Sequence, residues 1–159
     1  MGNARVDASG NWGLALSGLD DGKTSFTARA SKDGVSSAWS NFRTVTVDTS
    51  APATPSITSP TEGSRLLKDV CDRYKFSGTA EPGSKVELFE GTTPKGTVKA
   101  NLSGNWAMSV HLKDLRTYYF RARATDIAGN VSGWSETRTI GVVPNFDTLK
   151  EDQPPDCSY

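Results

Sequence analysis

The chain repeats itself, and this internal repeat limits the folds that it can adopt. Residues 2–31 align without a gap onto residues 96–125, with ten identical positions. After a shift of one residue, 39–47 align onto 134–142 with five more identities. The identical positions include a Ser-Gly-Asn-Trp segment and a Phe-x-Ala-Arg-Ala segment. Because the repeat is about the size of one small domain, we interpret the chain as part of a tandem array.

The composition is typical of a globular chain, and its acidic and basic side chains are equal in number. Its 159 residues include 18 basic and 18 acidic side chains, 15 glycines and 35% hydrophobic residues. This balance gives no support for a nucleic-acid partner or for binding to an anionic membrane surface. No run approaches the ~18 apolar residues of a membrane-spanning helix, so we also expect no membrane insertion.

The repeat divides the chain into four parts. We expect residues 1–48 to be the C-terminal half of one repeat and residues 56–143 to be a complete repeat. Residues 49–55 contain two prolines and small polar residues, which disfavour a helix or a central strand, so we interpret them as a linker. Residues 144–159 match neither repeat, and their acidic, proline-rich composition predicts an extended or weakly ordered tail.

Alternating apolar residues predict short strands in both copies. The side chains of Phe120, Ala122 and Ala124 fall on one face of a predicted strand, and residues 26–30 have the same parity. Each Ser-Gly-Asn turn is followed by a tryptophan that shares a face with the next apolar residues. We therefore expect the structural core to include the aromatic residues of both copies, namely Trp12, Trp106, Phe26 and Phe120.

The number of strands indicates the fold class. The complete repeat shows about seven strand-like runs separated by turns rich in glycine and asparagine. We expect these strands at 56–59, 73–78, 85–89, 96–100, 106–110, 118–124 and 137–142. This pattern predicts an all-β chain with an immunoglobulin-like β-sandwich, in which one complete repeat is preceded by a partial one.

Three segments carry a family resemblance. Residues 77–89, 103–106 and 122–132 resemble the bacterial immunoglobulin-like repeats of large surface adhesins and biofilm-associated proteins. The segment 47–52 is similar to the join that those repeats use. The resemblance implies neighbouring repeats of the parent chain as partners and an extracellular or bacterial cell-surface location.

This resemblance makes a structural spacer, or stalk repeat, of an extracellular adhesin or biofilm matrix protein the leading interpretation. Two alternatives are a ligand-binding module for a carbohydrate or a host protein, and an accessory module of a secreted hydrolase. We expect no enzymatic activity, because the sequence contains no nucleophile elbow, phosphate-binding loop or zinc-binding helix motif. The only histidine, His111, falls on a predicted strand and is interpreted as a surface residue.

Two aspartates are candidates for a calcium site. Asp126 ends a predicted strand that should face the preceding domain, and Asp48 lies in the linker region at that junction. Calcium prefers carboxylate and carbonyl oxygens, and the resemblance implies that such repeats stiffen their joints with it. Alternatively, Asp126 stabilises only its own turn by hydrogen bonds to the backbone.

The two cysteines suggest a disulfide. Cys71 should lie in the loop between the first two strands of the sandwich, at the end where the last strand leaves. The segment from Val143 to Cys157 is long enough to turn back to Cys71. We therefore predict a bond between Cys71 and Cys157, with two unpaired thiols as the alternative.

Two further tryptophans suggest contacts with arginine. Trp39 precedes Arg43 by four residues, and Trp134 precedes Arg138 by the same spacing. Since residues two apart share one side of a strand, we expect each tryptophan to contact its arginine at an edge of the sandwich.

The partial repeat lacks the residues that would cover its inner face. Because Gly2 aligns with Gly96, the first copy has no counterparts of residues 52–95. A sandwich needs two sheets, so the apolar side chains of the first copy have one side uncovered. We expect residues 1–48 to be poorly ordered, or to be completed by another chain through self-association or strand donation.

Overall fold

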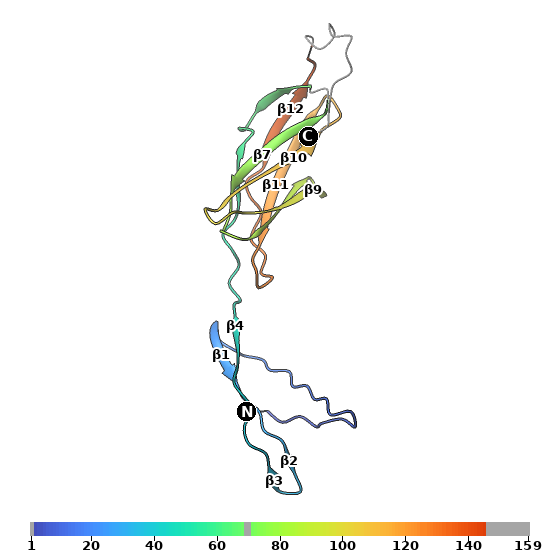
Figure 1. Cartoon of the computed structure of the whole chain (residues 1–159). Coiled ribbons are helices and arrows are strands. Elements are labelled where there is room, and N and C mark those ends of the chain that lie inside the picture. Colours follow the sequence, from blue (N-terminus) through green and yellow to red (C-terminus); the bar gives the residue numbers. More distant parts are fainter. Residues whose placement is uncertain (1, 69–70, 146–159) are drawn as a thin grey trace. The chain divides into compact units, whose positions relative to one another are not determined.

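The computed structural model describes residues 2–68 and 71–145, whose regular structure consists of β-strands (Figure 1). The chain divides into two compact units, Met1–Thr49 and Ser50–Tyr159. The described residues contain no helix of the length and hydropathy that a membrane crossing requires. These strands confirm the predicted all-β class.

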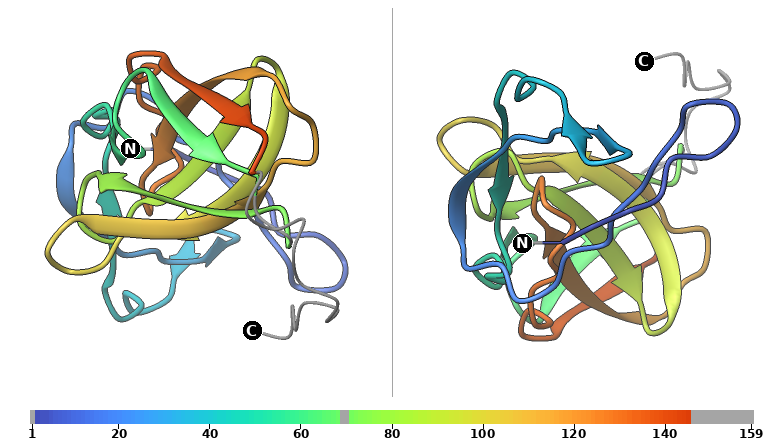
Figure 2. Two further views of the ribbon diagram at one scale, coloured as in Figure 1. Left: turned by 90° about the horizontal axis from the view of Figure 1, so that it is seen from above. Right: turned by 90° about the horizontal axis from the view of Figure 1, so that it is seen from below.

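The second unit contains two sheets that enclose a common interior (Figure 2). The smaller sheet has the order β10-β7-β5 and consists of β5 (Ser56–Ser59), β7 (Arg73–Thr79) and β10 (Asn105–His111). The larger sheet has the order β6-β12-β11-β8-β9 and consists of β6 (Ser64–Leu67), β8 (Lys85–Glu90), β9 (Thr93–Lys99), β11 (Thr117–Thr125) and β12 (Arg138–Val143). Neighbouring strands are antiparallel except β6 and β12, which are parallel. This arrangement is the predicted immunoglobulin-like β-sandwich.

Sequence reasoning missed one strand of this unit. β6 is a four-residue strand at the edge of the larger sheet, and it pairs only with β12 among the described residues. The apolar residues of β6, Leu66 and Leu67, are adjacent, so the segment shows no alternation from which a strand could be recognised. The parallel pairing with β12 joins the first part of the repeat to its last strand.

The core of the second unit lies between the two sheets. Phe76 of β7 packs against Phe120 of β11, with their ring centres 4.6 Å apart. The Trp106 side chain is 3% exposed, and its indole nitrogen donates a hydrogen bond to the carbonyl of Thr79 at 3.2 Å. Gly78 permits this packing, because a Cβ there would lie 1.8 Å from the carbonyl oxygen of Ser56 and 2.8 Å from the Trp106 ring.

Tyr118 links the core to the turn that precedes β11. Its ring is buried, and its hydroxyl donates to the carbonyl of Asp114 and accepts from the amide of the same residue, both at 3.0 Å. A tyrosine at the start of this strand that bonds back to the preceding backbone is a recurrent feature of immunoglobulin-like domains. Tyr118 therefore supports the fold assignment independently of the strand order.

The first unit repeats one hairpin of the second. β1 (Gly22–Phe26) pairs with β4 (Arg43–Val47), and the short strands β2 (Ser31–Lys32) and β3 (Val35–Ser36) pair with each other. Phe26 lies opposite Arg43, as Phe120 lies opposite Arg138 in the second unit. The sequence repeat is thus also a repeat of strand register.

The core predicted for the first copy is wrong for Trp12 and incomplete for Phe26. The Trp12 side chain is 58% exposed, and Phe26 is only half-buried. Among the described residues, the first unit has no sheet that faces β1 and β4. Without such a sheet, the alternating apolar residues have no layer against which to pack.

The second unit begins and ends at opposite ends of its sandwich. The register places Ser56, Thr79 and Asn105 together at the end where the linker enters. Leu67 and Val143 lie together at the other end, where β12 finishes (Figure 1). The chain therefore enters and leaves the second unit at opposite ends of its sandwich.

Replacing Trp106 by alanine should lower the free energy of unfolding of the second unit by about 3–5 kcal/mol, because a cavity replaces a buried ring. Trp12→Ala is the matched control, because it changes the same position of the repeat where the side chain is exposed. We expect this variant to lose less than about 1 kcal/mol. Urea denaturation followed by circular dichroism measures both losses, and equal losses would show that Trp12 is buried in solution.

Candidate functional site

The outer face of the larger sheet carries a group of aromatic and charged side chains, which we call the Trp134 cluster. It consists of Glu87, Phe89, Arg121, Arg123 and Trp134. The rings of Phe89 and Trp134 meet edge to face, with centres 5.1 Å apart. The guanidinium groups of Arg121 and Arg123 lie over the Trp134 ring, 5.1 and 5.2 Å from its centre.

Strand register explains this cluster. Alternate residues of β11 point outwards, and in the pairing with β8 Arg121 lies opposite Phe89 while Arg123 lies opposite Glu87. Arg123 donates to a carboxylate oxygen of Glu87 at 3.3 Å. Directly opposed side chains on neighbouring strands are close enough for such contacts. Sequence alone could have suggested these pairs only once the register of β8 against β11 was known.

The tryptophan–arginine contacts predicted from the four-residue spacing are wrong in their partners. Trp134 contacts arginines of β11, and Trp39 of the first unit contacts Arg29, whose guanidinium is 4.9 Å from the ring centre. Arg138 instead donates to the carbonyl of Ile57 and lies 3.9 Å from a carboxylate oxygen of Glu62. The tryptophan precedes β12 and lies over β11, whereas Arg138 is directed towards the other sheet.

Two serines hold the segment that carries each tryptophan. The hydroxyl of Ser135 accepts a hydrogen bond from the amide of Ala122 at 2.9 Å, and the amide of Ser135 donates to the carbonyl of Ala122 at 2.8 Å. Ser40 makes the same pair of bonds to Ala28 in the first unit, at 3.0 and 2.8 Å. A second serine three residues earlier makes equivalent bonds in each copy, Ser132 to Ala124 and Ser37 to Ala30. These serine bonds position the segment that carries the tryptophan in both copies. The tryptophan–arginine contact is therefore a structural feature that the two copies share.

Trp134 is 43% exposed, and Tyr119 on the same outer face is also exposed. Exposed aromatic rings beside arginines are groups that a ligand can contact. However, the arginines occupy positions over the Trp134 ring that a stacked ligand would otherwise take. The cluster thus presents exposed aromatic surface whose faces are partly occupied by its own arginines.

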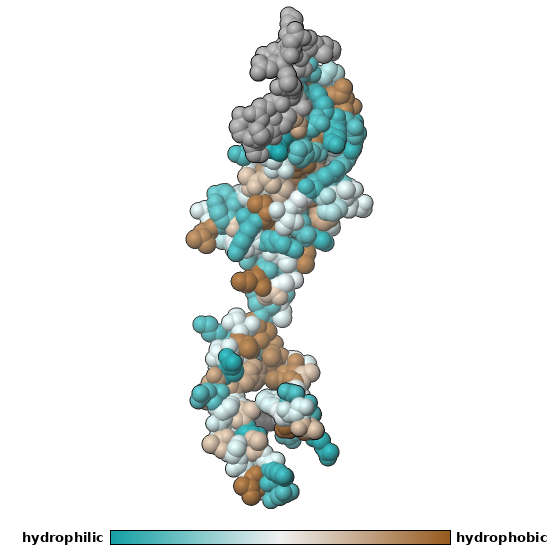
Figure 3. Space-filling model, turned by 45° about the vertical axis from the view of Figure 1, so that its right-hand side comes forward, coloured by the Kyte–Doolittle hydropathy of each residue, from teal (hydrophilic) through white to brown (hydrophobic). Residues whose placement is uncertain are grey.

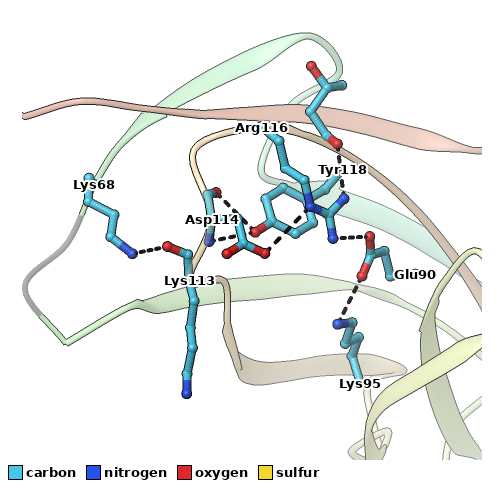
Figure 4. Close-up of polar contacts among 8 residues, drawn as sticks. Lys68, Glu90, Lys95, Lys113, Asp114, Arg116 and Tyr118 are labelled. Carbon is cyan, nitrogen blue, oxygen red and sulfur yellow. Dashed lines mark hydrogen bonds and ion pairs between the residues drawn. The ribbon is translucent and has the colours of Figure 1, made fainter.

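A second charged group lies near the start of β11, with Arg116 at its centre (Figure 4). Arg116 pairs with Glu90 at 2.7 Å, Lys95 pairs with the other oxygen of Glu90 at 2.9 Å, and the Arg116 guanidinium lies 3.8 Å from the centre of the Tyr118 ring. Burial raises the pKa of Glu90, but hydrogen bonds from Lys95 and Arg116 outweigh it and hold the pKa below its usual value. In the adjoining turn, Lys68 donates to the carbonyl of Lys113 and pairs with Asp72. These contacts tie neighbouring strand ends together.

Asp126 caps a turn. One carboxylate oxygen accepts hydrogen bonds from the amides of Gly129 and Asn130 at 2.7 and 2.8 Å, and the other accepts from the Asn130 side chain at 2.9 Å. Asn101 caps the turn before β10 in the same way, and Asp7 does so in the first unit. The recurrence of one turn at three places supports the structural interpretation of Asp126.

The calcium site at Asp48 and Asp126 stays a prediction. The two residues belong to different units, each of which is described by itself. Within residues 2–68 and 71–145, no group of three or more histidine, cysteine, aspartate or glutamate side chains is placed to hold a metal ion.

The predicted disulfide also stays a prediction. Cys71 is not a free thiol and lies between β6 and β7, at the end of the sandwich where the amide of Lys68 donates to the carbonyl of Val143 at 2.7 Å. Its predicted partner, Cys157, lies outside the described residues. Thiol titration of the denatured, unreduced chain should find no free thiol, and two free thiols would contradict the bond.

Two surface hollows of the second unit are lined, among the described residues, without the usual catalytic groups. One lies beside β6 and β12, and its lining includes Arg65, Arg116 and Thr139. The other lies on the smaller sheet, and its lining includes Lys75 and Asn105. Neither lining contains a carboxylate, histidine or cysteine, which are the common groups for general acid–base and nucleophilic catalysis. His111 is exposed at the end of β10.

Comparisons with known proteins identify no family for the chain. No protein-family profile and no curated protein matches it. Among solved structures, a fibronectin(III)-like module of CbhA from Clostridium thermocellum is 22% identical, with a TM-score of 0.47, over 57% of this chain and 96% of that one. A PKD domain of an M14-like peptidase from a Thermoplasmatales archaeon is 21% identical, with a TM-score of 0.46, over 62% of this chain and all of that one.

A third similar structure extends over more of the chain. It is a putative membrane-anchored protein from Corynebacterium diphtheriae, 22% identical with a TM-score of 0.47, and the match covers 87% of this chain and 34% of that one. At these levels of similarity, the fold assignment depends on the strand order and register described above.

Replacing Asp126 by asparagine should reduce the acid sensitivity of the second unit. Burial raises the pKa of Asp126, but hydrogen bonds from Asn130 and the neighbouring backbone together lower it by a larger amount, so the pKa lies below its usual value. The pKa of Asp126 is lower in the folded chain than in the unfolded chain. Its ionised carboxylate therefore stabilises the fold at pH values above the unfolded pKa of about 3.9. This contribution is lost as the pH falls through the folded pKa.

Asparagine keeps the accepting oxygen, as Asn101 does in its turn, but does not titrate in this range. Urea denaturation at about pH 7 and about pH 3 should show a smaller loss of stability for Asp126→Asn than for the unmodified chain. Glu136→Gln changes an exposed acid outside the turn and serves as the control. An unchanged pH dependence in Asp126→Asn would contradict the proposed role of the carboxylate.

Proposed function

We propose that the chain is a structural spacer from an extracellular adhesin or biofilm matrix protein, and that it holds a distal part of its parent away from the cell surface. The observation that supports this role best is the position of the two chain connections at opposite ends of the second unit. Units joined in this way extend an array with each added copy. A spacer needs a stable fold rather than a catalytic site.

The contacts common to both copies also favour a structural role. Both units contain the β-hairpin in the same register, the paired serines and the tryptophan–arginine contact. These contacts stabilise each repeat internally. In this proposal the partners are neighbouring repeats of the parent chain, and no reaction is catalysed.

Binding of a carbohydrate or a host protein is the second candidate function. The exposed Trp134 and Tyr119 of the larger sheet favour it. Such a module would serve equally well in an adhesin or beside the catalytic domain of a secreted hydrolase. Ligand-binding measurements are therefore needed together with measurements of shape.

A longer array tests the spacer role. Chains extended by one or two further copies of residues 49–143 should show, in small-angle X-ray scattering, a maximum dimension that increases by a constant step with each copy. On a glycan array, the same chains should give either no binding signal or a signal that persists in the Trp134→Ala variant. Compact particles whose maximum dimension does not increase would contradict the spacer role, and a signal that Trp134→Ala abolishes would favour ligand binding.

Calcium is a separate part of this proposal. If Asp48 and Asp126 contribute to a calcium site at the junction, ions that bind only the folded state should raise the melting temperature. Millimolar-range calcium should then stabilise the extended chains and a chelator should destabilise them, while Asp48→Asn should remove both effects. Identical melting curves with calcium and with chelator would contradict the site.

A further inference from the structure

The hollow beside β6 and β12 lies on the outer face of the larger sheet, and its floor is Gly141. Since Ile140 and Val142 are buried, alternation along β12 leaves Gly141 on the outer face. A Cβ at Gly141 would meet no atom within 4 Å, so the space above this position is open. The hollow has a volume of about 450 Å³, which lies within the range of about 300–1,000 Å³ that small-molecule sites have. It can therefore hold a small polar ligand.

Strand register places an arginine and a hydroxyl group beside this floor. Gly141 pairs with Arg65 of β6 on one side and with Thr117 of β11 on the other. Thr139, two residues before Gly141 on the same face, adds a second hydroxyl to the lining. Arg65 is exposed, and among the described residues its side chain makes no ion pair or hydrogen bond. The hollow thus offers a guanidinium and two hydroxyl groups to a ligand.

The charge of the hollow is positive. As far as the structure describes the chain, the lining contains two arginines and no carboxylate. Arg116 is already paired with Glu90 at 2.7 Å and lies 3.8 Å from a carboxylate oxygen of Asp114. Arg65 has no such partner within the described residues, so its charge attracts an anionic group from solution. Arginine pairs with a carboxylate through two parallel N–H donors, which fixes the orientation of the bound acid.

Two further exposed groups follow along β11. Tyr119 lies two residues beyond Thr117 on the same face and is 56% exposed. Arg121 comes next on this face, roughly 13 Å from Thr117 for four residues at about 3.3 Å each. Its guanidinium lies over the Trp134 ring, and no carboxylate within the described residues pairs with it. The face therefore carries two arginines without acidic partners, with an aromatic ring between them.

The fold does not require this combination of side chains. Figure 3 shows mainly hydrophilic side chains on the visible side of the second unit, with isolated apolar ones between them. At three positions of the outer face the first copy has small hydroxyl-bearing residues instead, namely Ser25 for Tyr119, Thr27 for Arg121 and Thr46 for Gly141. The Ser25 hydroxyl lies 2.7 Å from the hydroxyl of Thr44, and Thr27 donates to the carbonyl of Ser40 at 2.8 Å. The open floor, the exposed ring and the second arginine are thus additions of the second copy.

We propose that this face, which we call the Arg65 face, binds a polysaccharide whose sugars carry carboxylate groups. One carboxylate would enter the hollow and pair with Arg65, while hydroxyls of the same sugar would bond to Thr117 and Thr139. The apolar side of a neighbouring sugar would contact Tyr119, and a second carboxylate would reach Arg121. This inference rests on ligand binding, the second candidate function, and not on the spacer role.

A polysaccharide fits this face better than an acidic peptide. A peptide that joins a β-sheet pairs its backbone with a free strand edge, whereas the hollow lies on the face of the sheet, over β12. A peptide laid across this face would leave many of its backbone amides and carbonyls without partners, which weakens binding. A sugar needs no such pairing, because its hydroxyls bond to side chains while its ring carbons contact an aromatic surface.

Isothermal titration calorimetry of the full chain with short oligomers of galacturonic acid or of sialic acid tests this proposal. Arg65→Gln should weaken binding by about tenfold or more, because a charge-assisted hydrogen-bonded pair is lost. Gly141→Thr should weaken it to a similar extent, since it fills the hollow with the residue that the first copy has there. Because the added Cβ meets no other atom, this variant should melt no earlier than the unmodified chain.

The controls separate a specific site from a general attraction of charges. Lys75→Gln removes one positive charge from the outer face of the smaller sheet and should leave the affinity unchanged. The methyl ester of the galacturonate oligomer has the same sugars without their charges and should not bind. A glutamate-rich peptide supplies carboxylates without sugars and should not bind either. This pattern, together with weaker binding at higher salt, would support the proposal.

Other results would overturn it. Absence of binding of both acidic oligomers up to millimolar concentration would show that the Arg65 face does not bind carboxylated sugars. Unchanged affinity in Gly141→Thr would show that the hollow is not the site. Equal binding of the methyl ester would contradict an acidic ligand while still favouring ligand binding as a function, and equal binding of the peptide would make an acidic protein segment the ligand. The scattering measurement tests the spacer role separately.

Discussion

The fold depends on the packing of β7 and β8 against β10 and β11. These four strands contribute Phe76, Leu88, Trp106 and Phe120 to one interior, and they join residues that are far apart in the sequence. The two copies show how strongly the other strands depend on this packing. The Ser-Gly-Asn-Trp segment begins a strand and buries its tryptophan in the second unit, whereas in the first unit it forms no strand and leaves its tryptophan exposed. Among the described residues only the second copy has opposing strands, and the same local sequence has different structures in the two copies.

Other features depend only on local sequence. The turn capped by Asp7 has the same pattern of hydrogen bonds as the turn capped by Asn101, although the first unit has no second sheet. The hydrogen bond from the backbone amide of Asn11 is the largest contribution to the lowered pKa of Asp7. Ser40 likewise bonds to Ala28 as Ser135 does to Ala122. Asp7 and Asn101 bond to backbone amides two and four residues away, and Ser40 bonds to a residue twelve positions away in the same unit. None of these bonds needs a second sheet, so the motifs remain in a half-repeat.

The difference between local contacts and contacts between strands explains what could be predicted from the sequence. Alternation and turn residues were enough for the all-β class and the sandwich, because each strand of the second unit except β6 carries its own pattern. The arginine partners of Trp134 were not predictable from spacing along one strand, because they depend on the path of the segment before β12 across β11. The same applies to the contact between Phe89 and Trp134, which joins two segments 45 residues apart (134 − 89 = 45). Hydrogen bonds within a turn could be anticipated, as for Asp126, whereas contacts between strands required the structure.

The candidate functions also differ in whether they require contacts between several strands. A site for a ligand would require side chains from several strands to converge, and the Trp134 cluster is the place on the second unit where aromatic and charged groups do so. Its contact between Trp134 and Arg123 recurs as Trp39 and Arg29 in the first unit, which lacks β8 and the phenylalanine that β8 contributes. A contact that forms without the rest of the cluster cannot have ligand binding as its only purpose. The tryptophan–arginine pair is thus part of the framework of both copies, and any recognition specific to the second unit would depend on residues that differ between them, such as Tyr119 and Arg121.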